Sequence, residues 1–189
     1  MIFVTLGTHE QPFTRALDIV ADLSAEESIV VQHGATPPRT DMPSAEWVDY
    51  LEWPDLRDTM RAAEVVISHA GVGSAVTAIR AGRKPVLLPR LARYHEHVDD
   101  HQLQLAQAFR QRGLALSWDA ASDVRSLVEA ARSSVPPEMA ATSGLAEAVV
   151  RAAADVVPRR RRSARIVGPL VRARSRRRGG AGSVAARKS

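Results

Sequence analysis

Short apolar runs rich in β-branched residues alternate with helical patterns along the first 117 residues. Runs short enough to be buried strands lie at 2–6, 29–32, 48–51, 65–68, 85–88 and 114–117. Helical periodicity or helix-start signals mark 12–20, 55–63, 74–81 and 100–112. Two Ala-rich helices are expected before Val157. Because parallel strands need crossover connections, this alternation predicts an α/β fold, with a parallel sheet covered by helices on both faces.

Basic residues concentrate at the carboxyl-terminal end of the chain. Residues 158–189 hold 12 of the 26 Lys and Arg residues and none of the 21 Asp and Glu residues. The formal charge is therefore +12 for this tail and −7 for residues 1–157. We expect one folded domain over 1–157, because 189 residues can bury one core of good size, and a basic tail over 158–189 with the composition of a disordered segment.

The tail has three interpretations. It could be a solvated extension, or it could bind anionic lipid headgroups, where each Lys or Arg contributes on the order of 1 kcal/mol. Nucleic-acid binding needs only positive charge, but no aromatic residue is interleaved with these arginines and the attached domain is acidic, so we do not expect it. The chain has no cysteine, which excludes disulfides and thiolate metal sites. No apolar stretch approaches the roughly 20 residues of a membrane span, so secretion and membrane insertion are not expected.

The segment ISHAGVGSAVTAIRAGRKPVLLPR, residues 67–90, runs from an apolar strand through a glycine turn into a helix that we expect to start at Ser74. Unpaired N–H groups and the positive end of the helix dipole make such a turn an anion site. Gly71 and Gly73 would permit positive φ angles and a close approach of the ligand. The alternative is a tight packing turn. The pattern matches neither a P-loop nor the full dinucleotide fingerprint, which disfavours those two classes of protein.

Two longer segments carry a family resemblance. Together, MIFVTLGTHEQPF and HAGVGSAVTAIRAGRKPVLLPRLARYHEHVDDHQLQLAQAF resemble the carboxyl-terminal, sugar-nucleotide-binding half of glycosyltransferase family 28. The specific parts are H-A-G-x-G-S, the G-x-x-P-x-x-x-P that follows it, and D-H-Q. The likeness covers most of 1–115 and extends to the small stand-alone donor-binding subunits, namely the PssE/EpsF-like subunits of exopolysaccharide synthesis and the cytosolic subunit of the dolichol-linked N-acetylglucosaminyltransferase. It implies the Rossmann-like C-terminal half of a GT-B glycosyltransferase.

The resemblance also implies roles for individual residues. The turn that cradles the diphosphate of a UDP-sugar would be His69, Ala70, Gly71, Val72, Gly73 and Ser74. The neighbouring loop, facing the reaction centre, would be Gly7, Thr8 and His9. Arg90 would lie near the nucleotide, and Asp100, His101 and Gln102 would hold hydroxyls of the donor sugar. Thr77 stands where many members carry a glutamate that binds the ribose, so nucleotide binding would be weaker or would use another group. His9 and His69 are the candidate catalytic residues.

Several of these residues have simpler interpretations. His69 could only satisfy backbone groups at a strand end, His9 could be a solvent-exposed loop residue, and Gln102 could be a polar residue of a first helical turn. The Trp residues at 47, 53 and 118 are expected in the core or an interface. A metal ligand set is suggested by His95, His97, Asp99, Asp100 and His101. Its spacing fits no compact zinc pattern, and Asp99 or Asp100 is better explained as a helix N-cap, so we expect no metal.

The family resemblance implies a two-component enzyme. GT-B enzymes close a cleft between an acceptor-binding half and a donor-binding half, so we expect a membrane-anchored partner that binds a lipid-linked saccharide acceptor. The reaction would be inverting hexosyl transfer from a UDP-sugar, with the general base on either chain and no metal or cofactor. The chain would then be cytoplasmic, held at the inner face of the plasma membrane by its partner. Two alternatives stay open: an enhancer subunit that binds no donor, and a self-sufficient sugar-nucleotide enzyme such as an epimerase using His9 and Glu10.

Overall fold

The computed structural model describes residues 1–135. Two sequence-based predictions lie outside the described residues: the second Ala-rich helix before Val157 and the basic tail 158–189. Within the described part, no helix is both long enough and apolar enough to cross a bilayer.

The described residues form a six-stranded sheet in which every neighbouring pair is parallel. Its strands are β1 (Ile2–Thr5), β2 (Ile29–Gln32), β3 (Ala45–Val48), β4 (Val65–His69), β5 (Val86–Leu88) and β6 (Leu116–Ser117). Their order across the sheet is β3-β2-β1-β4-β5-β6. In the central strand β1, Ile2 lies opposite Ile29 of β2 on one side and Val65 of β4 on the other. The α/β fold predicted from the sequence is confirmed.

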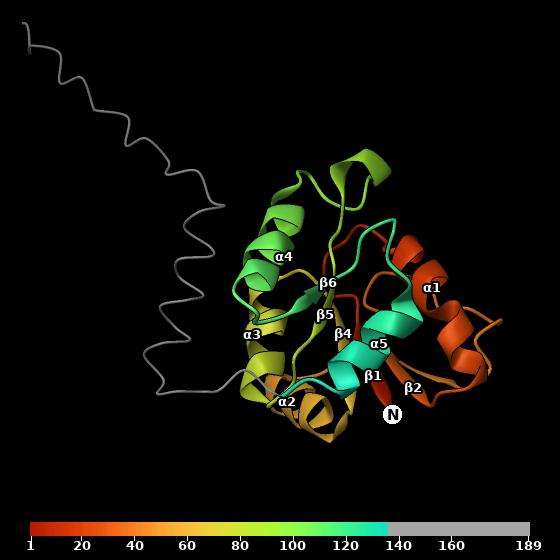
Figure 1. The fold of residues 1–189 in the computed structure, drawn as a ribbon. Coiled ribbons are helices and arrows are strands. Elements are labelled where there is room, and N and C mark those ends of the chain that lie inside the picture. The colour runs from red at the N-terminus through yellow and green to blue at the C-terminus, as the bar shows by residue number, and fades with distance from the viewer. Residues whose placement is uncertain (136–189) are drawn as a thin grey trace, which may run out of the picture. The chain divides into compact units, whose positions relative to one another are not determined.

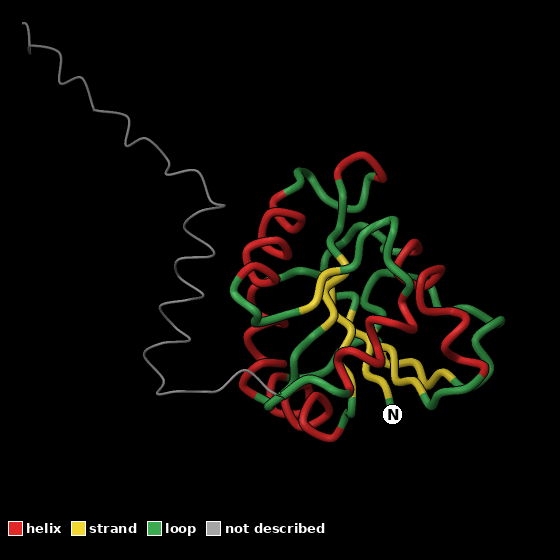
Figure 2. Tube along the Cα trace, viewed as in Figure 1, coloured by secondary structure: helices red, strands yellow, loops and turns green. Residues whose placement is uncertain are grey.

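Helices cover both faces of this sheet (Figures 1 and 2). One face carries α1 (Thr14–Val20), the 3-10 helix η1 (Ala21–Ala25) and α5 (Val124–Arg132). The other face carries α2 (Trp53–Ala62), α3 (Val72–Arg80) and α4 (His101–Gln111). A second 3-10 helix, η2 (Ala92–Tyr94), follows β5.

Strand residues alternate between the two layers and are buried in both. In β1, Val4 packs in the cluster with α1 and α5, whereas Phe3 packs in the cluster with α2. In β4, Ile67 and Val66 divide in the same way. Because both faces of the sheet are covered, the central strands have no solvated side, which explains their continuous apolar sequence.

Several element boundaries differ from the sequence-based prediction, and helix α3 begins at Val72 rather than at Ser74. The strand predicted at 48–51 lies at Ala45–Val48, because its pairing with β2 begins directly after the loop that ends at Ser44. The last strand is only Leu116–Ser117, since the amide of Leu114 still bonds the carbonyl of Phe109 in the turn that closes α4. Helix α1 begins at Thr14, later than predicted.

The strand order places a topological switch point between β1 and β4. The chain moves outward from β1 through β2 to β3 and then returns to β4 on the other side of β1. Crevices that bind ligands in such sheets open beyond the carboxyl ends of the strands at this point. The loops that follow β1 and β4, which begin at Leu6 and Ala70, are therefore neighbours.

Candidate functional site

A cleft of about 300 Å³ opens at the switch point. Its lining comes from the ends of β1, β2 and β4, the loop after β3, and helices α2 and α3: Thr5, Gly7, Thr8, Gln32, Tyr50, Leu51, Trp53, Leu56, His69, Gly73, Ser74 and Thr77. The small hydroxyl, amide and imidazole side chains lie on the β1, β2, β4 and α3 side, and the large aromatic and aliphatic side chains lie on the β3–α2 side. No carboxylate of the described residues lines the cleft. This composition suits an anionic ligand with one flat apolar part.

The amino end of α3 supplies free backbone donors to this cleft. Gly71 is the N-cap, and the first hydrogen bond within the helix runs from the amide of Ala75 to the carbonyl of Gly71. Helix geometry therefore leaves the amides of Val72, Gly73 and Ser74 without intrahelical partners. The first turn has no acidic residue, so its positive dipole end is not compensated by a carboxylate of that turn.

Two glycines enclose the imidazole of His69. A Cβ built on Gly7 would lie 2.7 Å from Cε1 of His69, and one on Gly71 would lie 2.4 Å from Nε2. Gly7 has a φ of +77°, whereas Gly71 has a φ of −81° and Gly73 lies within α3. Neither Gly71 nor Gly73 uses the positive φ that glycine permits, whereas Gly7 does. Gly71 is required by its contact with His69, and among the described residues nothing lies within 4 Å of a Cβ at Gly73.

His69 is held neutral by its surroundings. Its pKa falls from 6.5 to about 4, mainly because the ring is desolvated and also because the Arg90 guanidinium is nearby. The carbonyl of Thr5 lies close enough to oppose this shift slightly, yet the buried Nδ1 of His69 makes no well-formed hydrogen bond within the described residues. At neutral pH the uncharged imidazole can therefore serve the cleft only as a neutral donor or acceptor.

This pKa gives the domain a specific sensitivity to acid. Between pH 6.5 and about 4, His69 binds a proton in the unfolded chain but not in the folded one, so the free energy of unfolding falls as the pH falls. We expect a loss of up to about 3 kcal/mol from this group between pH 7 and pH 4. Urea denaturation at several pH values measures it, with His69→Asn as the non-titrating control. Identical pH dependence in both proteins would contradict this assignment.

Thr77 lies on the α3 wall of the cleft with its hydroxyl already engaged. The hydroxyl donates to the carbonyl of Gly73 at 2.8 Å, and the residue is 6% exposed. Its oxygen can still accept a hydrogen bond from a ligand hydroxyl. Thr5 and Gln32 form a second polar pair at the strand ends, where the Thr5 hydroxyl donates to Oε1 of Gln32 at 2.7 Å.

Arg90 lies behind the cleft and does not line it. The guanidinium donates to the carbonyls of Leu6, Gln11 and Glu96 at 2.8, 2.6 and 3.0 Å, and the residue is 1% exposed. Burial lowers its pKa to about 10, a shift that the Glu96 carboxylate opposes, so the group stays charged at neutral pH. Oε1 of Gln102 accepts from the backbone amide of Arg90 at 3.2 Å. Both side chains therefore fix the loops around β1 and β5.

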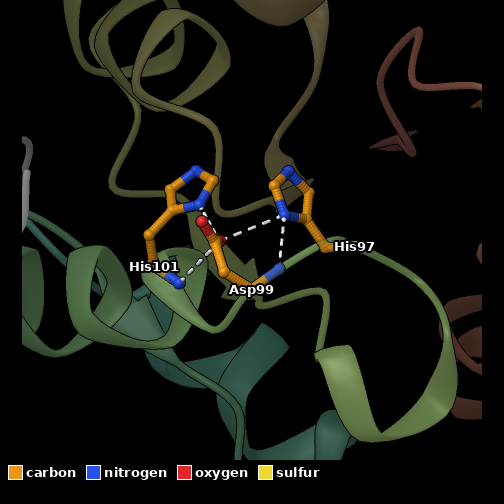
Figure 3. A group of neighbouring side chains, drawn as sticks. All are labelled: His97, Asp99 and His101. Carbon is orange, nitrogen blue, oxygen red and sulfur yellow. Dashed lines mark hydrogen bonds and ion pairs between the residues drawn. The ribbon is translucent and has the colours of Figure 1, made fainter.

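The loop before α4 brings three histidines together. The ring centroid of His97 lies 4.8 Å from that of His9 and 4.5 Å from that of His101. Asp99 lies between His97 and His101 (Figure 3). Burial and His101 lower the pKa of His97, and the hydrogen bond from His101 lowers the pKa of Asp99. Asp99 accepts from the His101 amide. The N-cap of α4 is Asp100, which makes no side-chain capping hydrogen bond and accepts instead from the Ala92 amide.

The structure brings about half of the predicted site residues to one cleft. The lining includes Gly7, Thr8, His69, Gly73, Ser74 and Thr77. The residues that lie outside the lining are His9, Ala70, Gly71, Val72, Arg90, Asp100, His101 and Gln102.

Sequence reasoning missed six lining residues, namely Thr5, Gln32, Tyr50, Leu51, Trp53 and Leu56. Thr5 and Gln32 carried a usable signal, because each is the polar residue that ends an apolar strand. Trp53, expected in the core or an interface, is 54% exposed at the cleft and is therefore not a core residue.

Two glycosyltransferase structures share this fold. The glycotransferase of kitacinnamycin and CalG4, the calicheamicin glycosyltransferase, each superpose with a TM-score of 0.54. They are 17% and 18% identical to this chain, and each comparison covers 82% of this chain and 38% of the other. At this identity the likeness shows the fold alone, which is that of the Rossmann-like half of a GT-B glycosyltransferase.

The sequence comparison identifies the family. The model of the glycosyltransferase family 28 C-terminal domain matches residues 1–156, so the chain belongs to that family. A 66-residue segment is also 41% identical to the UDP-N-acetylglucosamine transferase subunit ALG13 of Yarrowia lipolytica. That segment covers 34% of this chain and 32% of the relative, so this chain spans about a third of the relative it matches.

Proposed function

We propose that this chain binds the UDP-sugar donor of an inverting glycosyltransferase and works with a second chain that holds the acceptor. The observation that carries the proposal is the amino end of α3, whose free amides border a cleft that has an uncharged polar side and an apolar side. The diphosphate would bind the amides of Val72, Gly73 and Ser74. The base would lie against Tyr50 and Leu51, and the ribose beside Thr77.

Donor binding does not require charged side chains in the cleft itself. A departing diphosphate gains negative charge during sugar transfer, and fixed backbone donors stabilise that charge without reorganising. The buried guanidinium of Arg90 adds a positive field from behind, close enough to lower the pKa of His69. Neutral His69 could then contact the diphosphate or the sugar without an unfavourable proton transfer. We therefore propose no metal or cofactor for donor binding.

The support for a partner chain comes from a sequence relative and not from the fold. The Yarrowia lipolytica relative is named a transferase subunit, which supports a heteromeric assembly here. We propose a membrane-anchored partner, a lipid-linked saccharide acceptor in exopolysaccharide synthesis, and a cytoplasmic location at the inner face of the plasma membrane. The partner could supply the base that deprotonates the acceptor hydroxyl. Co-purification of a membrane glycosyltransferase chain with the tagged protein tests the assembly, and its failure under mild detergent would count against it.

Isothermal titration of the purified chain with UDP tests donor binding. Gly73→Val places two methyl groups at the helix amides, so we expect UDP affinity to fall at least about tenfold, the effect of losing one good charge-assisted hydrogen bond. The fold should persist, because a Cβ at Gly73 meets no atom of the described residues within 4 Å.

Arg80→Val is the matched control for this experiment. It adds the same side chain at the exposed carboxyl end of the same helix, away from the cleft, and should leave UDP affinity unchanged. Equal affinity of the Gly73→Val and wild-type proteins would reject the amide cradle.

One observation favours a second function, that of a stabilising subunit that binds no donor. Thr77 stands where the family resemblance places a glutamate that could bind both ribose hydroxyls, and its own proton is already donated to the carbonyl of Gly73. The same titration separates the two functions. Absence of UDP binding together with co-purification of the partner would favour the stabilising subunit.

A further inference from the structure

Three side chains around the start of α4 offer ligand atoms that lie close to one another. His97, Asp99 and His101 each present one such atom, and these atoms all lie within 4.8 Å of one another. Figure 3 shows the carboxylate of Asp99 between the two imidazoles, each of which turns its Nδ1 toward it. The three residues lie outside the lining of the donor cleft, although the family resemblance assigns His101 to hydroxyls of the donor sugar.

The spacing of these atoms approaches that of a coordination sphere. Zinc ligands lie about 2.0–2.2 Å from the ion, which sets neighbouring ligand atoms of a tetrahedron about 3.3 Å apart. The distance from Nδ1 of His97 to Oδ1 of Asp99 is 3.2 Å. His101 is 36% exposed at its side chain, so its ring can rotate away from the carboxylate to admit an ion. Nδ1 of His97 accepts a long hydrogen bond of 3.4 Å from the Asp99 amide, which an ion at this nitrogen would replace.

The surroundings hold the first ligand in place and leave the others accessible. The side chain of His97 is 10% exposed and its ring packs between those of His9 and His101. The two other carboxylates of the loop are engaged elsewhere, because Glu96 pairs with Arg15 at 2.7 Å and Asp100 accepts from the Ala92 amide. Asp99 is therefore the loop carboxylate that faces the imidazoles.

We infer that His97, Asp99 and His101 form a binding site for a divalent transition-metal ion, with Zn²⁺ as the best-matched ion. Two imidazole nitrogens and one carboxylate oxygen are borderline ligands that suit Zn²⁺ better than Mg²⁺ or Ca²⁺. Three protein ligands leave at least one position for water or for an oxygen of a bound molecule. The amino end of α4 opposes a cation slightly, but the carboxylate of Asp99 outweighs this dipole at contact distance.

Titration of the full-length chain without a histidine tag tests this site. After treatment with a chelator and dialysis, Zn²⁺ should bind with one-to-one stoichiometry in calorimetry, and Co²⁺ should give a visible ligand-field absorption that Zn²⁺ abolishes. His97→Ala and His101→Ala should each weaken Zn²⁺ binding at least about tenfold, because each removes one of three ligands. Mg²⁺ should not compete at equal concentration.

His95→Asn is the matched control. It removes one exposed imidazole from the same loop, and Asn tolerates the left-handed φ of 57° at this position. This variant should bind Zn²⁺ like the wild-type protein. Absence of one-to-one binding, or equal weakening by His95→Asn and His101→Ala, would overturn the site. Urea denaturation without metal verifies that each variant is folded, so that a lost fold is not taken for a lost ligand.

Discussion

Gly34→Ala is expected to lower the free energy of unfolding by about 3 kcal/mol. Gly34 has a φ of +55°, and a Cβ built on it would lie 2.3 Å from the carbonyl oxygen of Gly7. The new Cβ is fixed directly to the backbone and its neighbour is a backbone oxygen, so no side-chain rotation can relieve the contact. The loop after β1 must therefore move. Because Gly7 and Thr8 line the cleft, UDP affinity should fall with stability. Urea denaturation and calorimetry measure the two quantities.

Gly82→Ala separates the two causes of the lost stability, which are the positive φ and the contact of the new Cβ with a backbone oxygen. Gly82 has a φ of +79°, a comparable backbone strain, but within the described part of the chain nothing lies within 4 Å of a Cβ there. Its substitution should cost only the conformational term, about 1 kcal/mol. If both variants lost the same stability, the contact between Gly34 and the Gly7 carbonyl would have no energetic role.

The sequence was most informative where one strand and one turn decide the geometry. The run Val65–Ser68 followed by His69 predicted a buried strand that opens into a helix, and parallel sheets place such junctions at one edge. This rule predicts a ligand crevice at His69 and Ser74, and the family resemblance implies that Gly7 faces it; all three residues line the cleft.

The opposite wall of the cleft could not be predicted in this way. Tyr50 and Leu51 come from a loop without a motif, and their position depends on the register of β3 against β2. A shift of three residues in that strand moved them from the predicted sheet interior to the cleft. Register is fixed by pairing across the sheet, which local periodicity does not report.

The glycines show a second limit of sequence reasoning. The sequence suggests that Gly71 lets a ligand approach the backbone closely. In the structure, the missing side chain of Gly71 makes room for the imidazole of His69. The same residue type satisfies both requirements, so the sequence alone cannot separate them. His97, Asp99 and His101 show the converse, because the loop conformation brings together three side chains whose spacing along the chain fits no compact zinc pattern.

Arg90→Met is expected to cost about 4 kcal/mol of stability. It removes the guanidinium N–H groups that bond the carbonyls of Leu6, Gln11 and Glu96 and leaves these acceptors beside an apolar side chain. Arg90→Lys should not restore the loss, since a single ammonium cannot reproduce the planar set of donors. Arg93→Met is the control, because Arg93 is exposed and its guanidinium lies 4.9 Å from the ring of Tyr94; we expect less than about 0.5 kcal/mol.

The same Arg90 variants decide between two roles for this cation. The family resemblance places Arg90 near the nucleotide, whereas its hydrogen bonds in the structure fix the loop from Leu6 to Gln11. If it acts through the loop, UDP affinity and unfolding free energy should fall together in Arg90→Met and Arg90→Lys. A variant that keeps wild-type stability but no longer binds UDP would instead place the guanidinium on the nucleotide. Because the residue is 1% exposed, direct contact would require the loop to open first, and UDP binding would then be slow as well as weak.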